Sequence, residues 1–179
     1  MDFSNLKKMF FKEGECWADN DIPVNEEYVD TIKDLNRRYC CDREVVYVDI
    51  DGCVKGSKIG CGVWFGKDHV DNISIRCEES NATKSRAGLY AFIVALKVVK
   101  RRNTIRSTII VRVRHKYIKR AIKADGPKNR RHCAPNDDIL SRIRNMLFEF
   151  DLQCASVEIE YHRSRTNNAK KLAMAALLK

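Results

Sequence analysis

The strongest constraint on the fold is the order in which strand-like and helix-like segments follow one another. Residues 45–51, 60–66 and 70–76 are rich in β-branched and aromatic residues and are joined by short turns, which predicts an antiparallel meander. The pattern then alternates: helix 85–102, strand 105–113, helix 116–123, a helix capped by Asn136, strand 156–161 and helix 167–178. Strands reached through helical crossovers lie parallel to their neighbours. The order therefore predicts an α/β fold, with a five-stranded mixed sheet and helices on both faces.

Composition excludes several other classes of protein. The chain has 179 residues, 44% hydrophobic and 32% charged, which fits one soluble domain with an appendage. No apolar run approaches the ~20 residues of a membrane span, and the first residues lack the apolar stretch of a signal peptide. The 8 cysteines form no Cys-x-x-Cys pair, so we expect reduced thiols, no metal, no cofactor and an intracellular location in cytoplasm or nucleus.

The charge divides the chain into two parts. Residues 1–44 hold 7 Lys/Arg and 11 Asp/Glu. Residues 45–179 hold 27 Lys/Arg and 13 Asp/Glu, which is a net charge of +14. We therefore expect an acidic N-terminal extension, 1–44, followed by a basic domain, 45–179. Within the extension, Tyr28, Ile32, Leu35 and Tyr39 fall on one face of an amphipathic helix that either packs on the domain or docks a protein partner.

Several strings, in order, resemble the ribonuclease H family, particularly the eukaryotic type 1 enzymes. The similar segments are Ile50–Cys53, Gly62–His69 followed by Asn72, Thr83–Ala91 and Val113–Tyr117. The resemblance runs from about Val45 to Leu178 and implies the ribonuclease H-like fold. It also implies a site where four carboxylates hold two magnesium ions, since closely spaced divalent ions need several anionic oxygens.

The residues at the four implied metal-binding positions differ from that pattern. The first carboxylate is present as Asp51, with Asp49 two residues earlier as an alternative match. The other three positions fall on Gly88, Arg114 and Lys170, so the expected charge of −4 becomes +1. Arg114 and Lys170 are placed to pair with Asp51 in the space that the metals would need. We therefore expect no catalytic residues, no bound metal and no cleavage by this site.

Two further family features are altered. His162 is expected at a strand end rather than on a mobile loop, because the segment before the last helix is short and lacks glycine. The positions that read RNA in the family carry Lys84 and Ser85, and lysine can contact phosphate but cannot read 2′-hydroxyl groups selectively. Hybrid specificity is therefore not expected.

Cations are dense between residues 97 and 131, a region that borders the DNA-strand channel in the family. Such density favours binding to phosphate backbones without sequence readout, although a solvated basic face has the same composition. The candidates for contacts with nucleic acid are Lys84, Arg112, Lys116, Lys119, Arg120, Lys123, Lys128, Arg130 and Arg131.

These observations leave three hypotheses. The first is an inactive ribonuclease H-like protein that scaffolds a protein or ribonucleoprotein complex, with Gly88 giving room for a close backbone approach or a partner's side chain. The second is a sequence-nonspecific RNA- or DNA-binding module that acts through the basic region 97–131. The third is an active magnesium-dependent nuclease with a rearranged site, in which Asp49 joins Asp51. The sequence favours the first two over the third.

Overall fold

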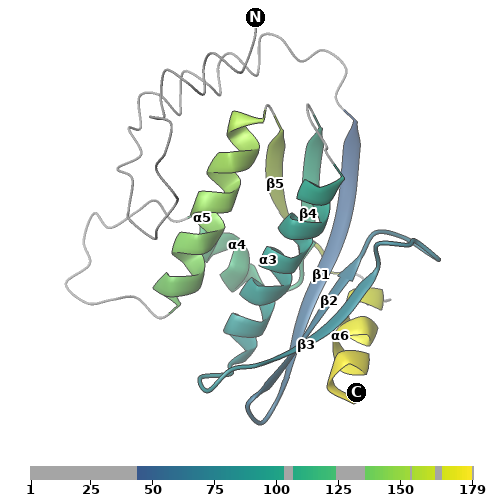
Figure 1. The fold of residues 1–179 in the computed structure, drawn as a ribbon, viewed down its shortest axis with the longest axis vertical. Helices are drawn as coiled ribbons and strands as arrows, with labels where there is room; N and C mark the ends of the chain where they lie inside the picture. Colours follow the sequence, from purple (N-terminus) through teal and green to yellow (C-terminus); the bar gives the residue numbers. More distant parts are fainter. Residues whose placement is uncertain (1–43, 103–106, 124–135, 154, 164–166, 179) are drawn as a thin grey trace, which may run out of the picture.

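The structure is a computed structural model that describes residues 44–102, 107–123, 136–153, 155–163 and 167–178. The described elements, labelled as in Figure 1, are β1 (Val45–Lys55), β2 (Lys58–Trp64), β3 (Ile73–Glu78), α3 (Lys84–Arg101), β4 (Thr108–Val113), α4 (Lys116–Lys123), α5 (Asp137–Leu152), β5 (Ser156–Tyr161) and α6 (Asn168–Leu178). The sequence predictions that fall on residues 1–43 and 124–135 lie outside the described residues. They include the extension helix with Tyr28, Ile32, Leu35 and Tyr39, and the cations Lys128, Arg130 and Arg131.

The strands form one five-stranded sheet in the order β3-β2-β1-β4-β5. β1 pairs antiparallel with β2, as in Asp51 opposite Gly62, and β2 pairs antiparallel with β3. On its other side β1 runs parallel to β4, with Ile50 opposite Val113, and β4 runs parallel to β5. The predicted sheet, a meander followed by two parallel crossover strands, is confirmed.

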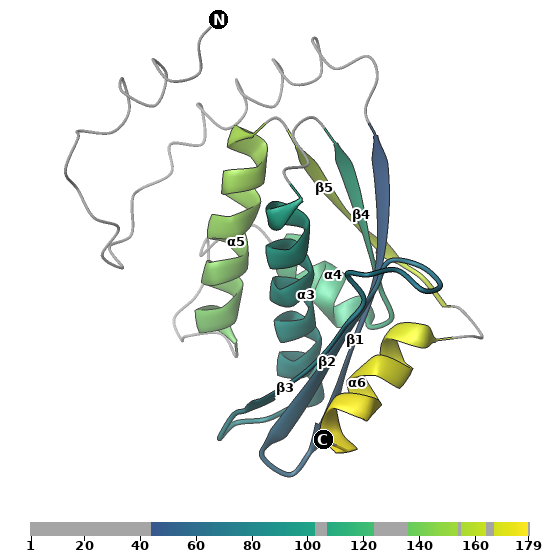
Figure 2. The same cartoon turned by 45° about the vertical axis from the view of Figure 1, so that its right-hand side comes forward.

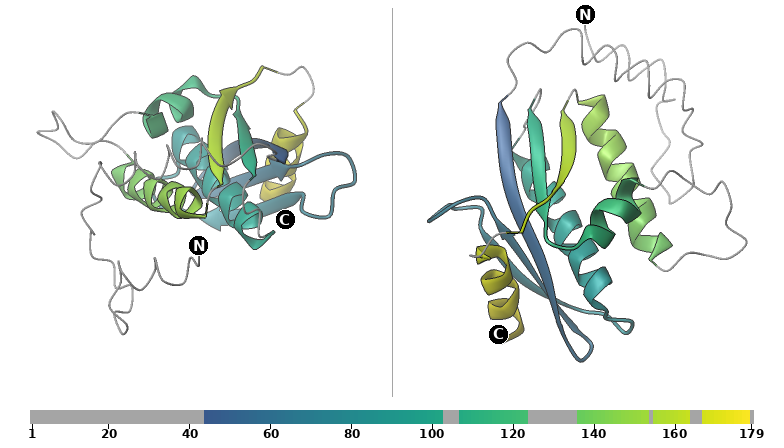
Figure 3. Two further views of the ribbon diagram at one scale, coloured as in Figure 1. Left: turned by 90° about the horizontal axis from the view of Figure 1, so that it is seen from above. Right: turned by 180° about the vertical axis from the view of Figure 1, so that it is seen from behind.

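Helices cover both faces of this sheet, as expected (Figure 2). α3 packs its buried Leu89, Phe92 and Leu96 against β1 and β2, and contacts α4 and α5 on the same side. α6 lies on the other side, as the two views of Figure 3 also show. The alternation along β2 makes this arrangement explicit, because the Cys61 thiol faces the Ala87 carbonyl of α3 while Gly60 and Gly62 face α6.

α6 approaches the sheet very closely. A Cβ atom built on Gly62 would overlap the carbonyl of Ala169, and one built on Gly60 would overlap the carbonyl of Ala173. Both residues of α6 are buried. The absence of side chains on β2 therefore lets the helix backbone lie directly on the strand, and this contact fixes where α6 begins, beside Asp51.

Two local predictions need correction. β3 begins at Ile73 rather than at residue 70, because the Asn72 side chain holds a longer loop: it accepts from the Phe65 N–H at 2.8 Å and donates to the Gly66 carbonyl at 2.8 Å. Asn136 precedes α5 but does not cap it with its side chain, since its φ of 74° is left-handed and its amide donates to the Tyr117 hydroxyl instead.

No helix among the described residues is both long enough and apolar enough to span a bilayer.

Candidate functional site

Asp51 is the centre of the site that the sequence singled out. It lies in β1 with 6% of its surface exposed. Its Oδ1 accepts from the Gly52 N–H at 2.9 Å, and its Oδ2 accepts from Asn167 Nδ2 at 2.5 Å. His115 follows β4 and places Nε2 at 3.9 Å from Oδ1. Three segments that are distant in sequence therefore meet at one buried carboxylate.

His115 and Asn167 were both missed by the sequence analysis. Burial lowers the pKa of His115, and Lys84 lowers it further, while Asp51 opposes the shift. The imidazole is consequently neutral at physiological pH, so its contact with Asp51 is not a salt bridge there. Asn167 is 116 residues from Asp51 along the chain, and no local pattern links the two.

The expected pairing of Arg114 and Lys170 with Asp51 is wrong. Within the described part of the chain, neither cation comes within ion-pair distance of this carboxylate, and the side chain at 3.9 Å from it is His115. Lys170 is exposed and Arg114 is half-buried. The physical reason is that Asn167 and the Gly52 N–H already occupy the carboxylate oxygens, while the two cations keep their hydration.

Gly88, the second implied metal-binding position, faces a side chain of the same protein. A Cβ atom built there would overlap Cδ1 of Ile118, which is buried in α4. The expected opening for a partner's side chain is therefore wrong, because Ile118 fills it. A close backbone approach occurs at the neighbouring Gly52 instead, since a Cβ atom built there would overlap the backbone of Ala87.

Asp49 is engaged elsewhere. Its carboxylate lies 2.6 Å from Nε of Arg112, whose guanidinium also stacks over Tyr47 at 5.3 Å from the ring centroid. Burial raises the pKa of Asp49 and Arg112 opposes that rise. His162 directly follows β5, as expected, and its N–H donates to the Val113 carbonyl. Across the described residues, no three His, Cys, Asp or Glu side chains gather in a way that suits a metal ion.

The cations between residues 97 and 123 include two groups with different surroundings. The first group is paired: Lys100 with Glu149 at 2.6 Å, Arg102 with Asp71, and Arg112 with Asp49. The second group is the run along α4, and none of its members pairs with a carboxylate among the described residues. It comprises Lys116, Lys119, Arg120 and Lys123.

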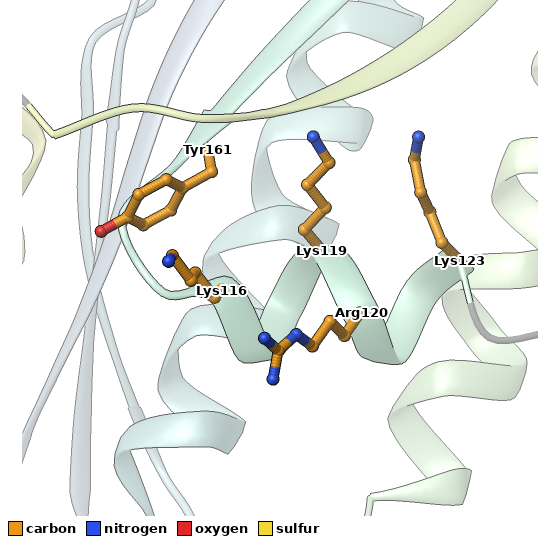
Figure 4. Close-up of a pocket in the computed structure, with 5 residues that line it drawn as sticks. All are labelled: Lys116, Lys119, Arg120, Lys123 and Tyr161. Carbon is orange, nitrogen blue, oxygen red and sulfur yellow. The ribbon is translucent and has the colours of Figure 1, made fainter.

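These four cations and Tyr161 line an open hollow of about 540 Å³, which we call the basic hollow. Figure 4 shows the four side chains spaced along α4, with Tyr161 from the end of β5 beside Lys116. The Lys116 ammonium lies 5.3 Å from the centroid of the Tyr161 ring. The hollow thus combines one aromatic surface with several positive charges that meet no carboxylate among the residues that the structure describes.

Arg86 organises a third polar cluster, on the edge of the α3–α5 contact. Its guanidinium pairs with Asp138 at 2.7 Å and with Glu79 at 3.4 Å, and the Tyr90 hydroxyl donates to the same Glu79 at 2.5 Å. The hydrogen bond from Arg86 lowers the pKa of Asp138. This cluster ties α3 to α5 and to the loop before α3, so its role is in the fold.

Comparisons with known proteins agree with this architecture. The chain is 29% identical over 134 residues to a curated ribonuclease H of Schizosaccharomyces pombe, and the match covers 72% of this chain and 49% of that enzyme. The chain therefore spans about half the length of this relative. No family model matches the chain.

Solved structures share the fold at low sequence identity. The ribonuclease H1 of Halobacterium salinarum superposes with a TM-score of 0.52 at 22% identity, covering 74% of this chain and 97% of that one. LC11-RNase H1, solved in complex with an RNA/DNA hybrid, superposes with a TM-score of 0.57 at 18% identity, covering 73% of this chain and 95% of that one. The N-terminal ribonuclease H domain of a Mycobacterium tuberculosis protein superposes with a TM-score of 0.53 at 18% identity, covering 74% of this chain and 98% of that one. With the strand order and the sequence match, these likenesses show that the chain has a ribonuclease H-like fold.

Proposed function

We propose that this ribonuclease H-like protein binds nucleic acid through the basic hollow and does not cleave it. The observation that carries the proposal is that the cations of α4 line a concave surface without a carboxylate partner among the described residues. A cation that is free of an internal ion pair binds a phosphate without first breaking that pair, and releases counterions when it does so.

The spacing along α4 suits a sugar–phosphate backbone. Lys116 and Lys123 are separated by seven residues, a rise of about 10 Å in an α-helix. Successive phosphates of one strand rise by about 3.4 Å along a duplex axis, so the hollow matches a few consecutive nucleotides. Lys116, Lys119 and Lys123 fall on one side of the helix, which favours contact with a single strand.

The absence of cleavage is supported by the donor set around Asp51. Magnesium takes oxygen ligands, usually carboxylates, and a pair of magnesium ions needs several of them. Here the neighbouring positions carry an amide, an imidazole and two cations, and Asp49 is held by Arg112. At Gly88 a glutamate would have to displace the buried Ile118. This set of residues does not fit two divalent ions.

Related proteins favour the same class of partner. The structure of LC11-RNase H1 in complex with an RNA/DNA hybrid shows that the shared fold can hold a nucleic acid. Lys84 and Ser85, exposed and half-buried at the start of α3, support contact with phosphate rather than selective reading of RNA. We therefore propose binding that is insensitive to sequence. A protein partner for a scaffolding role stays a prediction, because its candidate residues lie outside the described part of the chain.

The basic hollow can be tested by fluorescence anisotropy with a labelled hybrid, duplex RNA and single-stranded RNA at low and at physiological salt. We expect Lys119→Ala/Lys123→Ala to weaken binding about tenfold and to lower the slope of log K against log salt by about 2. The matched control, Lys55→Ala/Lys67→Ala, removes one charge at the end of β1 and one from the β2–β3 connection and should change affinity less than about twofold. Equal losses in the two double variants would contradict the hollow as the binding surface.

The absence of cleavage has its own assay. An end-labelled hybrid incubated with the protein and magnesium or manganese should stay intact. Cutting that Asp51→Asn abolishes would show that a rearranged two-metal site works after all.

A further inference from the structure

Three cations from three different elements have their backbones close to Asp51. They are Lys84 in the first turn of α3, Arg114 immediately after β4 and Lys170 in the first turn of α6. The register that sets Ile50 opposite Val113 brings Arg114 beside Asp51, and Asn167 bonds both Asp51 and the Lys170 N–H. Gly52 packs on the backbone of Ala87, which lies about one turn after Lys84.

The pKa of Cys53 is raised chiefly by burial and then by Asp51, and Lys170 and Lys84 both oppose that rise. The pKa of His115 is lowered by burial, by Lys84 and, more weakly, by Arg114. The charges of Lys84, Lys170 and Arg114 therefore act on the two titratable groups that flank Asp51, Cys53 and His115.

This cluster carries an excess of positive charge. None of the three cations pairs with a carboxylate in the described part of the chain. Asp51 is 6% exposed, and its two oxygens already accept hydrogen bonds from the Gly52 N–H and from Asn167. The local balance is thus three positive charges against one buried negative charge, with a neutral His115 beside them. A group of this kind attracts an anion from solvent.

We propose that Lys84, Arg114 and Lys170 form a phosphate seat, which holds a backbone phosphate of the bound strand directly and without a metal ion. The inference rests on the proposed function, because it places a second contact on the same nucleic acid. Arg114 supplies the planar fork that binds two phosphate oxygens, and the two lysines supply point charges. Asp51 does not compete for these cations, because its oxygens are turned to Asn167 and to the Gly52 N–H.

The seat and the basic hollow are neighbours along the chain. Arg114 precedes Lys116 by two residues, so the cations continue from the end of β4 into α4. A strand that lies in the hollow consequently has its next phosphates near the seat. Two adjacent contact regions on one strand strengthen each other, because binding at the first raises the local concentration of phosphate at the second.

The test is the affinity for the same labelled hybrid, measured in a chelator and again in magnesium. Arg114→Gln/Lys170→Gln should weaken binding about five- to tenfold and lower the salt slope by about 2 in both buffers. The matched control is Arg101→Gln/Lys171→Gln, which neutralises two exposed cations, one of them next to Lys170 on α6. We expect the control to change affinity less than about twofold, and Lys170→Arg to retain wild-type affinity.

The outcomes separate the seat from the proposed function. If the Arg114/Lys170 variant binds like the control while Lys119→Ala/Lys123→Ala weakens binding, the seat is wrong and the hollow stands. If the wild-type protein binds no nucleic acid, both are wrong. If binding by the wild type requires magnesium, the metal-free seat is wrong. Thermal melts of each variant must match the wild type; if Arg114→Gln/Lys170→Gln does not fold, Lys84→Gln replaces it with the same expected direction.

A free phosphate is the other source of the same chemistry. Inorganic phosphate should displace the hybrid no better than chloride at equal ionic strength, because a free phosphate gains none of the contacts that the basic hollow makes with the rest of the strand. Displacement that is much stronger with phosphate, and that is lost in Arg114→Gln/Lys170→Gln, would overturn the assignment to a strand.

Discussion

Two sets of cations in this protein carry the same sign of charge in opposite surroundings. Arg86, Arg102 and Arg112 are 12%, 26% and 24% exposed at the side chain, and each lies against a carboxylate. The cations of α4 line an open hollow and meet no carboxylate among the described residues. The balance of +14 in residues 45–179 therefore overstates the charge that is free to meet a polyanion, and the tertiary structure decides which cations are free.

The paired set acts on the fold rather than on a partner. Arg86 joins α3 to α5, Arg102 joins the end of α3 to the loop after β2, and Arg112 joins β4 to β1. Arg102 also stacks on Phe65, 4.5 Å from the ring centroid. Each of these side chains would have to leave its carboxylate partner to reach a phosphate. The α4 lysines have no carboxylate partner to leave among the described residues.

Removal of Arg86 should have the largest effect on stability. Arg86→Ala leaves Asp138 and Glu79 without their cation, and we expect unfolding in urea to show a loss of about 2 kcal/mol. Affinity for a labelled hybrid should be unchanged. The control is Arg101→Ala, at an exposed position on the same helix. If Arg86→Ala lowers the free energy of unfolding no more than Arg101→Ala does, the paired cations do not stabilise the fold, and the distinction between the two sets of cations is wrong.

Arg112 is the sharpest case, because the sequence placed it among the candidates for nucleic-acid contact. Arg112→Ala should lower the free energy of unfolding by about 1 kcal/mol, through the loss of a half-buried ion pair and of the stack on Tyr47. Its affinity for the hybrid should stay within about twofold of wild type. A loss of affinity as large as that of Lys119→Ala/Lys123→Ala would show that Arg112 does contact the nucleic acid.

The smallest expected effect is a pH dependence. The hydrogen bond from Arg86 lowers the pKa of Asp138 below its ordinary value of 3.8 in the folded protein. The native state then binds fewer protons than the unfolded state in acid, so the stabilisation is present above the ordinary pKa and is lost as pH falls through 3.8 and below. Asp138→Asn should flatten this acid limb in thermal melts, whereas Glu78→Gln, at an exposed carboxylate, should not. Parallel limbs in wild type and Asp138→Asn would contradict the pairing.

The sequence predicted the fold better than the site because the two depend on different information. The strands of the meander and the helix from residue 85 follow from local periodicity, and the sheet order follows from the crossovers. Arg112 meets Asp49 only because β4 runs beside β1 in a particular register, across 63 residues of chain. The contact between Gly88 and Ile118 likewise depends on how α4 packs after β4.

The site was predicted in part for the same reason. The altered residues at positions 88, 114 and 170 can be identified from the sequence, because the resemblance to the family indicates which positions carry the carboxylates. What the sequence lacked was the partner of Asp51. Charge favoured a nearby cation, but hydrogen-bond geometry selected the amide of Asn167, which brings no second desolvated charge.

The bare surface of β2 has a consequence for reading relatives of this chain. Gly60 and Gly62 set the distance between α6 and the sheet, because any side chain at either position would overlap the backbone of α6 and push the helix away. A homologue with alanine or serine at the position of Gly62 must therefore seat its last helix higher, and its counterpart of Asn167 would no longer reach the first-strand aspartate. One column of an alignment would thus sort relatives into those that can build this amide–carboxylate contact and those that cannot.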